Sequence, residues 1–496
     1  MQGLAKRITR WLQLPQFFMG VLLFFVIESL WIAFSARYPQ AFDEQFHFGL
    51  IKIYSHHILP FLSGQPPDAN QFGAVAADPS YLYHYIMSFP YRLLAVFVHT
   101  EAAQVIILRL CDVALFGSGL VLFRRVLLRA RISAALVNAS MLLLVFIPIV
   151  PQLAAQINYD DLLFPAAALT YLLTFHVVDG LRERRIDGVK ILQLLAVCLF
   201  ASVVKYAYLP IFLAVIAWTA VVAWRSFGGV QPLRVATQKG FGQIARWPLI
   251  GLTTLVLIGA ILCSQRYVVN VARYGDPIPD CGKVLTVEQC LRYGPWHRNY
   301  DDQQQSHAGV SKNPVRYTGE WFYGLYYRLF FAINGDYTNY FPLPLPSIAA
   351  IVLALSGLVV MIREGRAIFR GNYHLVFFAV VILSYCGALW FDNYKDFLRT
   401  GQPVAINGRY LLPILLPMAA ILGRAISLSL RRRPATWKPL LATATLLLFI
   451  AGGGVLTFIS RSDDSWYWPN PAVKHVNHAA QKVLSPLLIE SGGKYY

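Results

Sequence analysis

Apolar stretches of membrane-spanning length alternate with short polar segments along almost the whole chain. A helix needs roughly 20 apolar residues to cross the hydrocarbon core of a bilayer. The pattern therefore predicts an all-α polytopic membrane protein with about eleven transmembrane helices. Nine of them lie at residues 17–35, 105–123, 132–151, 191–204, 209–224, 247–264, 347–362, 374–391 and 440–460. The other two are the fourth and the tenth along the chain, which run from about residue 161 to Arg182 and from Tyr410 to Arg424.

Composition supports this prediction and gives the chain an orientation. Of the 496 residues 57% are hydrophobic and 14% are charged, and the mean hydropathy is +0.50. The formal charge of +18 would suggest a nucleic-acid partner in a soluble protein. Here Lys and Arg gather at one end of alternate spans, which the positive-inside rule explains, so we expect no nucleic-acid partner. The N-terminus is then cytoplasmic, and residues 17–35 are expected to be a retained span rather than a cleaved signal peptide.

The transmembrane domain of residues 1–460 is predicted to include two long extracytoplasmic loops, residues 37–103 and 265–342, and an extracytoplasmic tail at 461–496 is predicted to follow it. The amphipathic pieces at 46–59 and 81–98 suit helices that lie in the membrane interface. Four of the six cysteines fall in or near predicted spans and are expected to be apolar packing residues. Cys281 and Cys290 instead lie in a long hydrophilic segment, where an extracytoplasmic setting would favour a disulfide between them.

Asp43 and Glu44 follow directly on the first span and are the strongest catalytic candidates. Asp43 and His47 share a helix face at i and i+4. Two carboxylates beside a membrane are costly unless they face a watery cavity or a ligand. They could act as a general base on a hydroxyl or hold a metal ion, and the plainer alternative is a pair of solvated interfacial carboxylates.

Four further motifs carry candidate substrate-binding residues, each with an ordinary alternative. Interfacial aromatic belts account for tyrosines, a helix N-terminus favours acids, and lysines beside a membrane extend to its surface. An arginine on the outside runs against the positive-inside trend and offers a planar fork for phosphate. These candidates are Asp78, Tyr81, Tyr83, Asp160, Asp161, Lys205, Tyr208, Arg409 and Tyr410.

The order of these motifs resembles the GT-C superfamily of membrane glycosyltransferases, which use lipid-linked sugar donors, and most closely an uncharacterised bacterial family within it. That family's first motif usually reads Asp-Glu-x-x-His, which this chain keeps. Its second often reads His-Pro-Pro-Leu-Tyr-Tyr, where this chain has Asp78 in place of His and Ser80 in place of the second Pro. The motifs that carry the resemblance are Asp43-Glu44-Gln45-Phe46-His47, Asp78-Pro79-Ser80-Tyr81-Leu82-Tyr83, Asn158-Tyr159-Asp160-Asp161, Lys205-Tyr206-Ala207-Tyr208-Leu209-Pro210 and Gly408-Arg409-Tyr410-Leu411-Leu412-Pro413.

The resemblance implies a GT-C-like bundle in a bacterial inner membrane with an extracytoplasmic active site. The implied reaction is an inverting transfer of a sugar from a polyprenyl-phosphate donor to a glycan, lipid or protein acceptor. Asp43 would be the base, Glu44 or Asp78 would orient it or help to hold Mg²⁺ or Mn²⁺, and Lys205 and Arg409 would neutralise the departing phosphate.

Two other classes of membrane protein stay open. One is a flippase or transporter for a lipid-linked saccharide. The other is an O-antigen-type polymerase or ligase that uses Arg292, His297, Arg298 and His307. Convergence of Asp43 and Arg409 on one place in the fold would favour the transferase.

Overall fold

The computed structural model describes residues 2–40, 43–62, 64–305, 312–330, 344–432, 437–451, 462–484 and 486. Within these residues the chain is helical and contains no strand, only one isolated bridge between Ala36 and Tyr467. An all-α membrane fold is therefore confirmed at this level.

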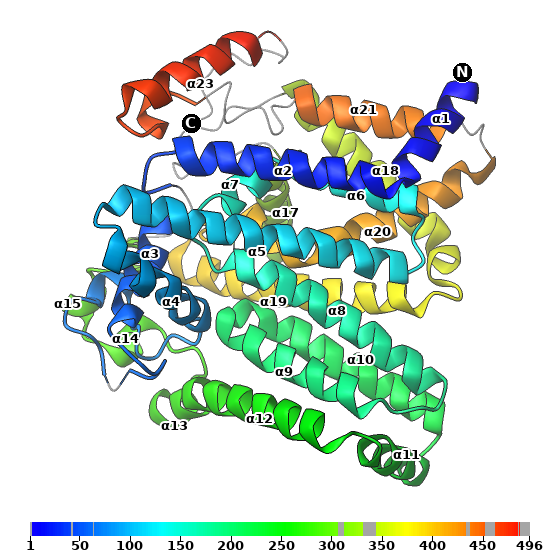
Figure 1. The fold of residues 1–496 in the computed structure, drawn as a ribbon, viewed down its shortest axis with the longest axis horizontal. Coiled ribbons are helices and arrows are strands. Elements are labelled where there is room, and N and C mark those ends of the chain that lie inside the picture. The colour runs from blue at the N-terminus through cyan, green and yellow to red at the C-terminus, as the bar shows by residue number, and fades with distance from the viewer. Residues whose placement is uncertain are drawn as a thin grey trace.

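Seven helices or helical runs in the described residues are long and apolar enough to cross a membrane. In Figure 1 most of them run side by side across the width of the molecule. They contain α2 (Pro15–Ser35), α5 (Glu101–Arg129), α8 (Asp160–Arg182), α10 (Leu209–Phe227), α12 (Arg246–Cys263), α19 (Tyr373–Thr400) and α20 (Leu412–Ser429).

The remaining predicted spans correspond to shorter or partly described helices, so a count of eleven is not confirmed. The helix α9 (Gly188–Val204) matches the fifth predicted span but has only 17 residues. The helix α18 (Pro344–Phe369) coincides with the eighth predicted span. The helix α21 (Trp437–Ala451) coincides with the first part of the eleventh, and the end of that span lies outside the described residues.

The third predicted span, residues 132–151, is not one helix. It is split into α6 (Ala134–Val145) and the short α7 (Ile149–Ala154). Pro148 stands at the break and has no backbone N–H to continue the α6 hydrogen-bond ladder. The prediction of one continuous span over these residues is therefore wrong.

The core of the bundle is an aromatic stack where α2, α5 and α8 meet. Phe164 stacks on Phe116 at a ring-centroid distance of 4.3 Å, and Phe116 contacts Phe25 at 5.5 Å. Gly119 permits this packing, since a Cβ there would lie 2.4 Å from the Phe164 ring. The helix α8 is the most buried candidate span, whereas α12 is the least buried and packs mainly on α9.

Short helices gather at the end of the bundle where α2 ends and α8 begins, which we call the loop end (left in Figure 1). The predicted interfacial helices are present there as α3 (Glu44–Ser55) and α4 (Leu82–Phe97). The other short elements are η1 (Asn70–Phe72), η2 (Tyr206–Tyr208), the π-helical turn η3 (Ser264–Val268), α13 (Val269–Tyr274), α14 (Cys281–Val284), α15 (Val287–Cys290), α16 (Gly294–Gln304) and η4 (Gly408–Leu411).

Six elements outside this group complete the described fold, among them the 3₁₀ turns η5 (Leu430–Arg432) and η6 (Asp464–Trp466). At the N-terminus, α1 (Gln2–Gln13) precedes α2, and α11 (Val230–Gly242) joins α10 to α12. The helix α17 (Pro314–Phe330) packs on η4 and α19. The tail helix α23 (Pro471–Leu484) is fastened to α2, since Trp31 donates to the side chain of Asn477 at 2.9 Å. The tail therefore returns to the end of the first span.

Candidate functional site

A buried ion pair between Glu44 and Arg109 organises the loop end. Both side chains are fully buried, and the guanidinium donates to the two carboxylate oxygens at 2.7 and 2.8 Å. Arg109 comes from the first half of α5, and Glu44 opens α3. A planar two-point pair of this kind fixes orientation as well as distance.

The same pair also fastens three stretches of backbone. Arg109 donates to the carbonyls of Ala33 and Ala36 at the end of α2. The Glu44 carboxylate accepts from the backbone N–H groups of Gln40 and Ile157 at 2.7 and 3.2 Å. Because all four oxygen lone-pair directions are engaged, Glu44 positions the segment that carries Asp43 and is not available as a catalytic base.

Asp43 has the opposite character to its neighbour. Its side chain is 54% exposed and its backbone lies in the left-handed region, with φ of 71°. Such a backbone is uncommon outside glycine and often marks a functional position. Arg409, 366 residues later in the chain, donates to Asp43 Oδ2 at 2.8 Å. The two predicted residues therefore converge.

The position of Arg409 follows from its own local sequence. The Asn407 side chain accepts from the Arg409 backbone N–H at 3.0 Å and begins η4. Gly408 lies against α17 so closely that a Cβ would be 2.4 Å from the backbone nitrogen of Leu329. Only glycine allows this approach.

A second ion pair lies beside the first. Lys205 donates to Asp160 Oδ1 at 2.6 Å, and both side chains are about 5% exposed or less. Burial lowers the pKa of Lys205, and Asp160 opposes that shift. The Lys205 Nζ lies 4.3 Å from the Tyr159 ring centroid and 5.0 Å from that of Tyr410, and Arg409 Cζ is 5.3 Å from the Tyr410 ring. Tyr410 thus joins the two ion pairs into one cluster.

A pair of neutral histidines adjoins this cluster. His47 Nδ1 and His84 Nε2 are 2.8 Å apart, and the ring of Tyr159 meets His47 edge-on at 4.5 Å. Burial lowers the pKa of His84 to about 3 and holds that of His47 well below its ordinary value. Neither ring carries charge at neutral pH, so His47 can orient a group by hydrogen bonding but does not supply a cation.

Tyr83 and Asp161 lie deeper, around a residue that the sequence motifs missed. The Tyr83 hydroxyl donates to Asp112 on α5, with its oxygen 2.9 and 3.0 Å from the two carboxylate oxygens. The Asp161 carboxylate is fully buried, and neither of its oxygens has a hydrogen-bond partner among the described residues. Arg109 and Asp112, two charged residues inside the predicted second span, were a usable signal, since such residues are rarely without a role.

Three predicted site residues lie apart from the ion-pair cluster. The Tyr208 hydroxyl is buried against Thr170 Oγ1 at 2.5 Å, which indicates a packing role. Asp78 accepts from the backbone N–H of Ser80 at 2.8 Å, and burial raises its pKa. Tyr81 stacks under a different arginine, Arg266.

The second long loop covers the site and is closed by the predicted disulfide. Cys281 and Cys290 are bonded, which confirms that prediction for the structure. Tyr293 hydrogen-bonds through its N–H to the carbonyl of Cys290 and lies over Phe46 and Gly73. The disulfide thus holds the segment that roofs the residues beside His47.

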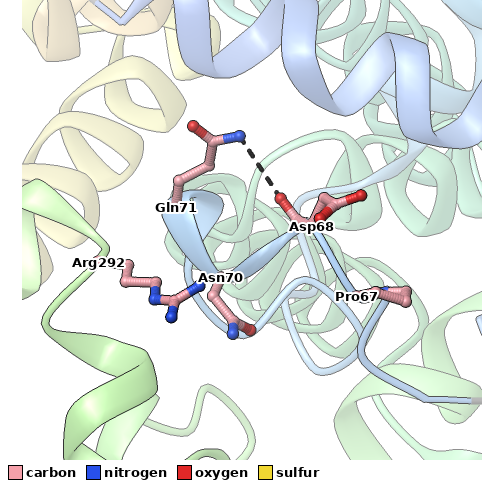
Figure 2. A pocket seen from close by; sticks show the side chains of 5 residues that line it. All are labelled: Pro67, Asp68, Asn70, Gln71 and Arg292. Atoms are coloured by element: carbon pink, nitrogen blue, oxygen red, sulfur yellow. Dashed lines mark hydrogen bonds between the residues drawn. The ribbon is translucent and has the colours of Figure 1, made fainter.

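A shallow polar hollow lies at the outer rim, where the two loops meet (Figure 2). Arg292 approaches it from the second loop, opposite a first-loop segment in which Gln71 donates to the backbone carbonyl of Asp68. Its lining residues are Pro67, Asp68, Asn70, Gln71 and Arg292. Arg292, His297 and Arg298 are all exposed and His307 lies outside the described residues, so no buried centre for the polymerase reading is seen among them.

The residues proposed to hold Mg²⁺ or Mn²⁺ do not form a common site. Asp43 pairs with Arg409, Glu44 pairs with Arg109, and Asp78 caps a turn. In the part of the chain that the structure describes, no three His, Cys, Asp or Glu side chains come together as metal ligands would. We therefore derive no step through a metal ion.

No family model, no curated protein and no solved structure matches this chain. The resemblance to the GT-C superfamily therefore rests on the motifs alone, and the geometry of the ion-pair cluster is the remaining evidence for a function.

The Glu44–Arg109 pair predicts a large loss of stability on removal of one partner. Glu44→Gln leaves the Arg109 charge buried and uncompensated, which costs about 3–5 kcal/mol of the free energy of unfolding. The midpoint of thermal unfolding of the purified protein measures this. The control is Glu101→Gln, which breaks an exposed pair with Lys52 and should cost about 0–1 kcal/mol. Equal midpoints for the two variants would contradict the role given to Glu44.

The histidine pair predicts that stability falls as the solution is acidified. Because the folded-state pKa values of His47 and His84 are lowered, the unfolded chain binds protons first as pH falls below about 6.5. Each histidine then costs up to about 1.4 kcal/mol per pH unit between pH 6.5 and 5. Thermal unfolding at pH 7.5 and 5.5 should show a smaller pH effect in His84→Gln than in wild type, while the exposed-histidine control His56→Gln should match wild type. An unchanged pH effect in His84→Gln would refute this explanation.

Proposed function

We propose that this protein is a GT-C-like membrane glycosyltransferase that moves a sugar from a polyprenyl-phosphate donor to an acceptor hydroxyl. The observation that carries the proposal is the half-exposed carboxylate of Asp43, held by Arg409 in a left-handed backbone beside the Lys205–Asp160 pair. Four residues from four separate motifs meet there, which scattered interfacial charges would not do. The plasma membrane of a bacterium, with the loop end on the extracytoplasmic side, is the setting we propose for it.

In the proposed reaction Asp43 is the general base. Its Oδ2 is engaged by Arg409, and no described residue hydrogen-bonds to Oδ1. Asp43 takes the proton of the acceptor hydroxyl as that oxygen attacks the anomeric carbon of the donor sugar. The bond from the anomeric carbon to the phosphate oxygen breaks, and the electron pair leaves on the polyprenyl phosphate. Attack opposite the leaving group inverts the anomeric configuration.

The two ion pairs favour other roles for Lys205 and Arg409 than neutralising a departing phosphate. Lys205 and Arg409 each have a carboxylate partner, so each pair is neutral overall. We assign Arg409 to hold Asp43 in place, and Lys205 to fix the start of α8 through Asp160. Tyr159 and Tyr410 supply ring faces at the same place, on which a sugar can stack.

The alternatives lack this support. A flippase has no need of an exposed carboxylate anchored by an arginine at the membrane edge, whereas a transferase requires a base at its acceptor site. The arginine and histidine residues of the polymerase reading lie exposed along the second loop, and His297 is engaged with Asp301.

The proposed function predicts that Asp43→Asn abolishes sugar transfer. Loss of a general base typically lowers the rate by about 10²–10⁴-fold. The asparagine keeps the size of the side chain and tolerates a left-handed backbone, so the variant should fold. Purified protein is incubated with polyprenyl-phosphate sugars, and released polyprenyl phosphate is measured.

The control is Asp68→Asn, which removes an exposed carboxylate of the same loop and should leave transfer unchanged. Transfer by Asp43→Asn at more than about a tenth of the wild-type rate would exclude Asp43 as the base.

A further inference from the structure

One buried arginine in the described residues makes no direct ion pair. Four basic side chains are buried there: Arg109, Lys205, Arg266 and Arg409. Arg109, Lys205 and Arg409 each contact a carboxylate within 2.8 Å. Arg266 is completely buried and makes no ion pair with any described residue. Asp78 lies near enough for its charge to interact with Arg266, but not within ion-pair distance. Part of the cost of burying the guanidinium charge is therefore not offset by direct pairing.

The Arg266 guanidinium is also short of hydrogen-bond acceptors. Its Nη2 donates weakly to the Tyr54 hydroxyl at 3.3 Å, and Nε and Nη1 have no partner among the described residues. The guanidinium carbon lies 4.5 Å from the Tyr81 ring centroid. Nη2 carries a second N–H besides the one that faces Tyr54, and together with Nε or Nη1 it forms the two-donor edge that binds two oxygens of one phosphate.

The backbone around Arg266 departs from a regular helix. Arg266 lies in the π-helical turn η3, at the join between α12 and α13. Such turns are rare in proteins, and those that occur are often found at functional sites. Asn270, one turn further on, donates to the carbonyl of Ala77 at 2.8 Å and ties this turn to the Asp78–Tyr81 motif. The Asp78–Tyr81 motif, which takes no part in the ion-pair cluster, therefore lies beside Arg266.

The helix that leads to Arg266 faces outward along most of its length. Only 11% of the most apolar stretch of the Arg246–Tyr274 run is buried, and Ile258 and Ile261 are exposed. In a bilayer such side chains contact lipid. An apolar chain in the bilayer can therefore lie along α12, which leads to the turn that carries Arg266.

We infer that Arg266 binds the phosphate of a polyprenyl-phosphate lipid, with the apolar chain lying along α12. This inference rests on the proposed function, which requires a donor of that class, and names the residue that takes its phosphate. The negative charge that develops on the phosphate as the glycosidic bond breaks would meet a guanidinium that is not directly paired with a carboxylate. Tyr293 links the two neighbourhoods, since the charges of both Asp78 and Asp43 act on its hydroxyl.

The test measures lipid binding without turnover. The full-length protein in lipid nanodiscs is titrated with decaprenyl phosphate, with decaprenol, which lacks the phosphate, and with inorganic phosphate. Arg266→Gln should weaken the binding of decaprenyl phosphate at least about tenfold and leave the binding of decaprenol unchanged. Arg273→Gln is the matched control, because it removes the same charge from an exposed position on the adjoining α13.

Two further measurements keep the result interpretable. Without ligand, Arg266→Gln should unfold at the same temperature as wild type or higher, since it removes a buried charge that has no direct ion-pair partner. Arg266→Lys keeps the charge but loses the planar fork, and should bind decaprenyl phosphate with intermediate affinity.

Equal affinity of wild type and Arg266→Gln for decaprenyl phosphate would overturn the inference. Equal weakening by Arg273→Gln would also overturn it, and so would inorganic phosphate binding as tightly as the lipid. Binding that depends on Arg266 in a protein that transfers no sugar would instead leave the site standing and refute the transferase proposal.

Discussion

The Glu44–Arg109 ion pair is the interaction on which the rest of the loop end depends. Two charges in a dry interior are tolerated only when the pairing geometry is good and every remaining donor and acceptor is used. Here the surplus donors of Arg109 hold the end of α2, and the surplus lone pairs of Glu44 hold the chain before α3 and before α8. Because these anchors fix the backbone on both sides of Asp43, that residue can keep an unfavourable conformation with an exposed carboxylate.

Much of the architecture was predictable because helix length and side-chain polarity are local properties. The spans around residues 17–35, 105–123 and 374–391, the two interfacial helices and the disulfide were all predicted from the sequence. The break within residues 132–151 was not predicted, because an apolar run is typical of a span but does not show that the helix is interrupted at Pro148. For the same reason, apolar runs alone do not determine the number of membrane spans.

The candidate site was predicted in part, and the limit is physical. The convergence of Asp43 and Arg409 followed from motifs that lie at the same end of different spans. The division of labour between Asp43 and Glu44 could not follow, because two adjacent acids look alike in sequence and differ only once the backbone turns one inward. Partners separated by 65 residues, as Glu44 and Arg109 are, leave no local pattern. The unpaired Nε and Nη1 groups of Arg266 are likewise visible only after folding.

The left-handed backbone at Asp43 restricts how this position can change over evolution. Asparagine, aspartate and glycine accept such a φ most readily, whereas β-branched and bulky residues are strained there. Glutamate would keep the charge but would lose the backbone tolerance and would reach one methylene further. Drift at this position is therefore confined to side chains that preserve the turn, and of these only aspartate carries a carboxylate. Backbone shape and acid–base chemistry thus select the same residue for independent reasons.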